Sequence, residues 1–304
     1  RNEPGITVIL DGGSTDLGTD IRELLVDVPG GEVVYLEWEE LEWVEFGPAP
    51  AGARSRSPRL YGTVEDHRGN RYTGQIAWDN DEVLASDTLE GEETLGRQRE
   101  ILFSEIGSIE KSVSGARVTL TDGEVVELRG SNDVDYDNRG ILVADPDLGI
   151  VTLEWEVFDH VRFHPLEGEG ASSGNGFRAF DGGHGLRGTV VTEDGSELTG
   201  RIRWDADEEA SWELLDGDRN GVAFEVEFGK IALIEKASRE SARVTLLDGR
   251  VLELEGSNDV DRDNKGILVK PEEGGPTSAT GEPVWIKVEW ADFREVRFDH
   301  GGGS

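Results

Sequence analysis

The sequence predicts an all-β protein built as a tandem array of small five-stranded β-barrels with an internal duplication. Three observations carry this prediction. Short segments of alternating apolar and polar residues are bounded by Gly-containing turns, and 41 of the 304 residues are Gly. One apolar signature recurs five times, and a long block of sequence is repeated. No stretch of useful length has helical periodicity.

The signature is an aromatic residue followed by apolar residues three and six positions later. A spacing of three is the period of a 3₁₀ turn, which stacks side chains on one side. Because each copy follows an alternating strand, we expect a strand, one 3₁₀ turn and a short final strand around a small core. The copies are Trp38, Leu41 and Val44; Phe103, Ile106 and Ile109; Trp155, Phe158 and Val161; Phe228, Ile231 and Ile234; and Trp290, Phe293 and Val296.

The duplication divides the chain into two alternating unit types, which we call a and b. Trp78-Asp79 recurs as Trp204-Asp205, 126 positions later, and this offset holds without a gap over long stretches. The predicted units are a single b-type unit at 1–47, a linker at 48–59, a-type at 60–112, b-type at 113–166, a Gly/Ser-rich linker at 167–185, a-type at 186–237, b-type at 238–299 and a tail at 300–304.

The spacing of elements within each unit resembles that of SH3-like and Sm-like small barrels. Each unit from residue 60 on opens with a hairpin of one spacing, as at Val64 and Gly69 or Val118 and Gly123, and closes with the signature. The units read from the sequence have about 50 residues, and units of that size have marginal cores. We therefore expect neighbouring a-type and b-type units to share an interface.

Charge and composition limit the partners. The net charge is −35, which opposes binding to nucleic acids and anionic membranes, and Arg54 and Arg56 form the only basic island. No apolar run is long enough to span a bilayer. Cys and Met are absent. Because the sequence does not begin with Met, we expect that a leader has been removed or that the chain starts inside a longer precursor. We expect a secreted, extracellular or periplasmic product, although a trimmed cytoplasmic chain would have the same composition.

The strongest internal match is a loop rich in Asp and Asn. Residues 130–143 and 256–269 are identical at 12 of 14 positions. Oxygen ligands at alternate positions are how a short loop wraps Ca²⁺, but the Glu that closes an EF-hand loop is replaced by Ala144 and Lys270. Asn and Asp also bond their own backbone in turns, and we favour that interpretation. The N-terminal unit keeps only Asp16 and Asp20. The candidate ligands are Asp133, Asp135, Asp137, Asn138, Asp259, Asp261, Asp263 and Asn264.

The repeated Trp-Asp pairs have two interpretations. An aromatic ring beside a carboxylate can bind a carbohydrate, whereas Trp alternating with Ile76 or Ile202 at period two is typical of a core. We favour the core for Trp78 and Trp204, as for the Trp residues of the signatures.

Catalytic signals are weak. The His residues share no metal-ligand spacing, and neither a nucleophile elbow nor a phosphate loop is present. They are His67, His160, His164, His184 and His300. We expect no enzymatic activity and no cofactor other than Ca²⁺. A polysaccharide-active enzyme with scattered carboxylates is a weaker alternative.

These observations favour a non-enzymatic extracellular structural or interaction protein. The lone b-type unit at 1–47 has no a-type partner before it, so its partner-facing side should be open to a second copy. Such head-to-tail contacts build filaments unless they close into a ring. If a preceding unit has been removed, a monomer is expected instead. The alternative function is a secreted module that binds calcium or glycans through the paired Asp loops.

Overall fold

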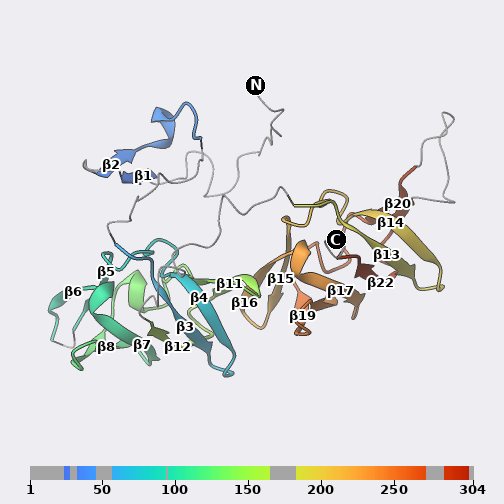
Figure 1. Ribbon diagram of the computed structural model, residues 1–304. Coiled ribbons are helices and arrows are strands. Elements are labelled where there is room, and N and C mark those ends of the chain that lie inside the picture. Colours follow the sequence, from blue (N-terminus) through green and yellow to red (C-terminus); the bar gives the residue numbers. More distant parts are fainter. Residues whose placement is uncertain are drawn as a thin grey trace. The chain divides into compact units, whose positions relative to one another are not determined.

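Figure 1 shows the computed structural model, which describes residues 24–27, 33–45, 57–93, 95–164, 183–271 and 284–300. The described elements are strands and short 3₁₀ helices, which confirms the all-β prediction. Asp16, Asp20, Arg54, Arg56 and most of both linkers and the tail lie outside the described residues. Within the described ranges, no helix is long and apolar enough to cross a membrane. The chain divides into two units, which are described separately below.

The N-terminal unit contains one described hairpin and the first signature. Strands β1 (Leu24–Asp27) and β2 (Val33–Leu36) pair antiparallel, and the 3₁₀ helix η1 (Trp38–Glu40) follows where the signature predicts it. The Glu40 side chain accepts a hydrogen bond from Glu37 N at 3.1 Å and so caps this helix. None of the three signature side chains is buried: Trp38 and Leu41 are half-buried and Val44 is 53% exposed. The neighbouring Trp43 is 69% exposed.

The second unit contains two repeats with the same order of strands. The first comprises β3 (Tyr61–Asp66), β4 (Arg71–Ala77), β5 (Thr88–Glu92), β6 (Gln98–Leu102), η2 (Phe103–Glu105), β7 (Ile106–Ser112), β8 (Gly115–Leu120), β9 (Val125–Leu128), η3 (Asn132–Val134), β10 (Ile141–Asp145), β11 (Gly149–Leu153) and β12 (Phe158–Phe163). The second comprises β13 (Arg187–Thr192), β14 (Glu197–Arg203), β15 (Leu214–Arg219), β16 (Val222–Glu227), η4 (Phe228–Lys230), β17 (Ile231–Lys236), β18 (Ser241–Leu246), β19 (Val251–Glu255), β20 (Ile267–Pro271), β21 (Ile286–Val288) and β22 (Phe293–Phe298).

Within each repeat, strands of the a half pair with strands of the b half. In the first repeat, β12 lies between β3 and β7, and β10 pairs with β4. The resulting order is β9–β8–β7–β12–β3–β4–β10–β11, and β19–β18–β17–β22–β13–β14–β20–β21 is its counterpart. The predicted closed five-stranded barrels are not found among the described residues, because the last strand of each b half bonds to the a half. The assignment of a-type and b-type boundaries stays a prediction.

The two repeats form one continuous antiparallel sheet. Strand β11 of the first repeat pairs with β16 of the second, with Ile150 opposite Glu225 and Leu153 opposite Val222. Figure 1 shows these two strands meeting between the repeats. Through this pair and the β15–β19 contact, 18 strands belong to one sheet.

Each repeat has an equivalent aromatic centre. The Trp78 ring lies 6.2 Å from Trp155 and 5.4 Å from Phe158, both edge to face. In the second repeat, Trp204 lies 6.3 Å from Trp290 and 5.4 Å from Phe293. Edge-to-face pairs of this kind add about 1 kcal/mol each to area burial. All twelve signature side chains of the two repeats are buried: Phe103, Ile106, Ile109, Trp155, Phe158, Val161, Phe228, Ile231, Ile234, Trp290, Phe293 and Val296.

Candidate functional site

A tight turn follows β4 and recurs after β14. In the first repeat, Trp78 N donates to Glu82 O at 2.8 Å, and Asp79 and Asn80 have φ values of 49° and 66°. Asp and Asn tolerate this left-handed conformation better than most residues. The turn places Asp79 in the protein interior, where its side chain is fully buried, and Asp205 occupies the same position in the second repeat.

The Asp-rich loop of the b half packs on this turn. Trp78 Nε1 donates to Asp133 O at 2.8 Å, and Glu90 N donates to Asp133 Oδ2 at 2.6 Å. The equivalent bonds of the second repeat run from Trp204 Nε1 to Asp259 O at 3.0 Å and from Asp216 N to Asp259 Oδ2 at 2.8 Å. The best-matched stretch of the duplication therefore lies at the contact between the two halves of a repeat.

A basic residue from the same loop neutralises the buried Asp of each turn. Arg139 Nη2 lies 2.6 Å from Asp79 Oδ2, and the Arg139 main-chain N donates to Asp79 Oδ1 at 2.5 Å. Asn132 also donates to Asp79. Hydrogen bonds to Asp79 and Asp81 raise the pKa of the Arg139 guanidinium above its ordinary value. In the second repeat Lys265 replaces Arg139, with Nζ 2.9 Å from Asp205 Oδ2.

Three carboxylates meet beside each ion pair. Asp79, Glu82 and Asp133 each bring one oxygen within 4.8 Å of the other two, and Asp205, Glu208 and Asp259 do the same. We call these two groups the acidic triads. Oε2 of Glu82 and Oε2 of Glu208 are buried and have no hydrogen-bond partner. Each triad therefore holds more carboxylate oxygens than the surrounding protein satisfies.

Burial and mutual repulsion shift the titration of the acidic triads. Desolvation raises the pKa of Asp133 to about 6, and the nearby Asp79 and Glu90 charges add to this effect, while the bond from Glu90 N opposes it. The pKa of Asp259 is raised to about 7, again mainly by burial. Burial and the charge of Asp133 also raise the pKa of Glu82 well above that of a free Glu. The Glu82 carboxyl group therefore keeps a proton near neutral pH unless a cation replaces it.

The acidic triads have the oxygen ligands that a hard divalent cation prefers. Asp79 and Asp205 already have a cationic partner, so an ion would share these carboxylates with Arg139 or Lys265 or displace the side chain. The unpartnered Glu82 and Glu208 oxygens are the groups that such an ion would satisfy. Without a bound ion, a proton retained on each of these Glu carboxyl groups would remove the unpaired buried charge.

Only two of the eight predicted ligands belong to the triads, namely Asp133 and Asp259. Of the others, the side chains of Asp135, Asn138, Asp261 and Asn264 close turns of their own loop. Asp137 N donates to Asp135 Oδ1 at 3.0 Å, and Gly140 N donates to Asn138 Oδ1 at 3.0 Å. In the second repeat, the corresponding bonds are Asp263 N to Asp261 Oδ1 at 2.7 Å and Gly266 N to Asn264 Oδ1 at 2.9 Å. These contacts are the turn chemistry that we favoured over calcium ligation.

The sequence prediction missed Asp79, Glu82, Asp205 and Glu208 as members of a carboxylate cluster. The two Asp residues were noted only beside Trp. A signal was available, because Glu82 recurs as Glu208 at the same offset of 126 positions as the Trp-Asp pair. The distance along the chain to Asp133 hid their proximity.

The Trp rings of the two aromatic centres have no surface to offer a sugar. Trp78 and Trp204 are 0% exposed, and both belong to the aromatic centres. A sugar-binding ring must present one face to solvent, so these residues act as core. Trp155 and Trp290 are also buried.

A third cluster joins His160 to two acids in the first repeat. His160 Nδ1 lies 3.0 Å from Asp159 Oδ2, and Nε2 lies 3.9 Å from Glu65 Oε2. The equivalent positions in the second repeat are Val191, Arg294 and Glu295, so the duplication does not preserve this set of ligands.

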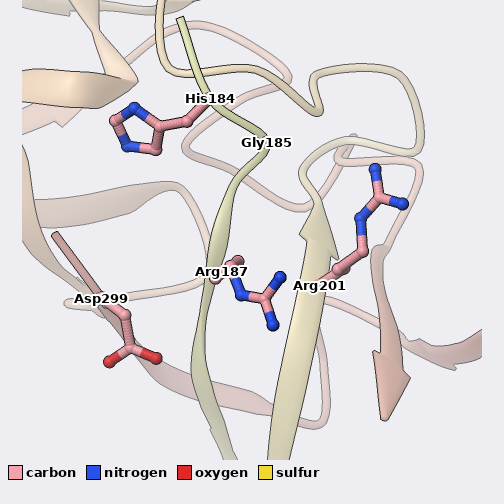
Figure 2. Close-up of a pocket in the computed structure, with 5 residues that line it drawn as sticks. All are labelled: His184, Gly185, Arg187, Arg201 and Asp299. Carbon is pink, nitrogen blue, oxygen red and sulfur yellow. The ribbon is translucent and has the colours of Figure 1, made fainter. Parts of the chain in front are cut away.

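A surface cavity of about 600 Å³ lies beside β13 and β14. Figure 2 shows its lining residues His184, Gly185, Arg187, Arg201 and Asp299. Arg187 and Arg201 are cross-strand partners. The equivalent cavity of the first repeat is lined instead by Tyr61, Phe103 and His164 among others. The two cavities thus share a position but not a chemistry.

Comparisons with known proteins do not identify the chain. No protein-family model matches it, and no curated protein matches it. Among solved structures, a streptogramin B lyase matches with 11% sequence identity over 81% of this chain and 96% of that chain, at a TM-score of 0.12. At that TM-score the likeness supports no conclusion about fold or function.

Proposed function

We propose that this chain is a non-enzymatic structural or interaction protein of the extracellular or periplasmic space, whose β units associate head to tail. The observation that carries the proposal is the β11–β16 pair, by which one repeat extends the sheet of the next. A protein that joins its own repeats through strand edges can join copies in the same way.

Several kinds of interaction stabilise the contact between the repeats. Besides the strand pair, the Phe224 ring lies 6.1 Å from Tyr72, and Arg68 Nη1 donates to Asn220 O at 3.0 Å. The Gly149 backbone approaches so closely that an added Cβ would lie 2.3 Å from Glu225 O. Main-chain bonds, an aromatic contact and close packing therefore act together.

The N-terminal unit is the first proposed site of self-association. Val44 is 53% exposed, whereas the equivalent Val161 and Val296 are fully buried. In the complete repeats, this position packs against strands of the a half. The exposed apolar face of the N-terminal unit would be covered by a second copy, and a contact of this heterologous kind propagates into filaments.

The test is negative-stain electron microscopy together with light scattering, on the full chain and on a chain lacking residues 1–47. Fibres or concentration-dependent oligomers that vanish with the deletion are the expected result. A full chain that stays monomeric up to millimolar concentration would overturn the proposed self-association.

A second candidate function is the binding of a hard cation such as Ca²⁺. The specific observation is the pair of equivalent acidic triads with a buried, unpartnered Glu oxygen in each. Asp79, Glu82 and Asp133, with their counterparts in the second repeat, would hold the ion. Glycan binding has less support, because the Trp residues that would form the platform are buried.

A further inference from the structure

The last strand edge of the second repeat borders a surface groove. Among the described residues, β21 pairs with β20 on one side only. A cavity of about 470 Å³ is lined by β21, the β13–β14 turn and Asp292. A strand edge beside a groove can accept an added strand.

This groove corresponds to the place where the first repeat holds the β15–β16 hairpin. By the 126-residue offset, Asp194 and Leu198 take the places of Arg68 and Tyr72, which contact Asn220 and Phe224. The last signatures, at Trp155 and Trp290, lie 290 − 155 = 135 positions apart, and this offset places Ile286 at the position of Val151. The residues that line the groove are thus the counterparts of those that form the joint between the repeats.

Burial shows the difference between a covered and an uncovered joint. Tyr72 and Val151 are buried in the first repeat, whereas their counterparts Leu198 and Ile286 are only half-buried. The second repeat therefore leaves apolar area open on the same face that the first repeat covers.

The charge of the groove indicates the kind of strand that fits. Val157, whose Cγ1 lies against Gly221 in the joint, is replaced by the exposed Asp292, and Arg68 is replaced by Asp194. Glu193 lines the same groove. A strand with basic residues at the positions of Val222 and Phe224 would complement this face.

Strand β6 of the first repeat has those residues. It is the counterpart of β16, and among the described residues it pairs with β5 only. Counted back from the signatures, Arg97 and Arg99 take the places of Val222 and Phe224. Both make exposed or partly exposed ion pairs with Glu93, which association would exchange for new ones.

We propose that the groove beside β21 binds β6 of a second copy of this chain by antiparallel strand addition. In the register of β11–β16, Ile286 lies opposite Arg99 and Val288 lies opposite Arg97. Asp292, in the place of Val157, then lies against Gly96, next to Arg97.

In the first repeat, the Gly149 backbone approaches Glu225 too closely for a Cβ, and Val284 takes this position in the second repeat. We therefore place the start of the pairing at Trp285. The inference rests on the proposed self-association and adds a second joint to that of the N-terminal unit, so that loss of either joint weakens assembly. The β21–β6 joint is heterologous and builds an open chain of copies.

The test is a charge swap in the full chain, followed by light scattering. Asp292→Arg in one preparation and Arg97→Glu in another should each raise the concentration needed for assembly by at least about tenfold, because like charges would face each other. An equimolar mixture should restore assembly, because each altered groove then meets an altered strand and each native groove a native strand.

Matched controls are Asp263→Arg and Arg71→Glu, which make the same charge changes at exposed positions outside the groove and β6. They should leave assembly unchanged, and circular dichroism should be the same for all variants. If the wild type assembles and the swapped variants assemble equally well, the β21–β6 joint is wrong while self-association stands. If the wild type never assembles, both proposals fail.

Discussion

Asp79 and Arg139 lie sixty positions apart in the sequence, and their side chains meet at 2.6 Å with the carboxylate fully buried. Asp79 comes from the turn after β4, and Arg139 from the loop before β10. This ion pair therefore ties the a half of the first repeat to its b half. Breaking it by removing the cation would leave a buried charge without a partner.

Replacing Arg139 with Met should lower the free energy of unfolding by about 3 kcal/mol, the lower end of the range for a broken buried ion pair, since Arg139 itself is partly reached by water. Urea denaturation measures this change. The matched control is Arg117→Met, which removes exposed ion pairs with Glu110 and Glu127 and should cost less than about 1 kcal/mol. Equal losses in the two variants would contradict the tie between the halves.

The acidic triads predict a pH dependence of stability. Burial raises the pKa of Asp259 to about 7 in the folded protein, against an ordinary value of 3.8. The folded state therefore binds more protons than the unfolded state, and this contribution is fully present below pH 4 and lost as pH rises toward 7. In Asp259→Asn, the fall in unfolding free energy between pH 4.5 and 7.5 should be smaller by on the order of 1–3 kcal/mol, since one pKa unit corresponds to about 1.4 kcal/mol. Urea titrations at several pH values measure the slopes, and identical slopes would contradict the shift.

Calcium at a concentration well above its dissociation constant should raise Tm by several degrees if the acidic triads bind it, because a ligand of the folded state alone stabilises that state by about 2.7 kcal/mol at a hundredfold excess over Kd. Alanine at Asp133 and Asp259 should abolish the rise. Alanine at Asp137 and Asp263, which belong to the same loops but not to the triads, should retain it. A melt that responds to neither calcium nor a chelator would leave only the retained proton.

Gly149→Ala should uncouple the two repeats. The added Cβ would lie 2.3 Å from Glu225 O, and φ at this position is +96°. Differential scanning calorimetry should then resolve two transitions in place of one. Gly69→Ala is the control, because φ is +84° there but nothing lies within 4 Å of the added Cβ, so only a backbone cost of about 1–2 kcal/mol applies. A single transition in both variants would mean that the β11–β16 pair does not link the repeats energetically.

The local part of this structure was predictable from sequence, and the long-range part was not. Alternation and the signature predict strands, an all-β class and a 3₁₀ turn in each signature, because each depends on residues within one turn or strand. The 3₁₀ turns at Trp38, Phe103 and Phe228 are confirmed, whereas those predicted at Trp155 and Trp290 are wrong, because the chain forms other turns there. The partner of β12 could not be inferred, because Val161 fits equally well beside β8 of its own half or beside β3. Main-chain hydrogen bonds between strands do not depend on which side chains the strands have. Closed barrels and the observed sheet are therefore compatible with the same pattern of alternating apolar and polar residues.

The candidate site shows the same division. The turn bonds of Asp135 and Asn138 follow from neighbouring residues and were expected. Asp79 and Glu82 come from the other half of the repeat, and only the packing of the two halves brings them to Asp133. A buried carboxylate was also not expected beside Trp78, because the alternation of a strand turns the residue after a buried one toward the other side.

The β3–β12 and β13–β22 pairs have a consequence for how a repeat of this chain can be duplicated. In each repeat, the entering and leaving segments run side by side: His164 N donates to Tyr61 O at 2.9 Å, and Asp299 N donates to Arg187 O at 2.8 Å. A coding segment that spans one repeat thus encodes a cassette whose two ends meet at one place on the surface. Copying such a cassette in tandem lengthens the protein without rethreading any strand, and the 126-residue duplication has the form that such an event leaves behind.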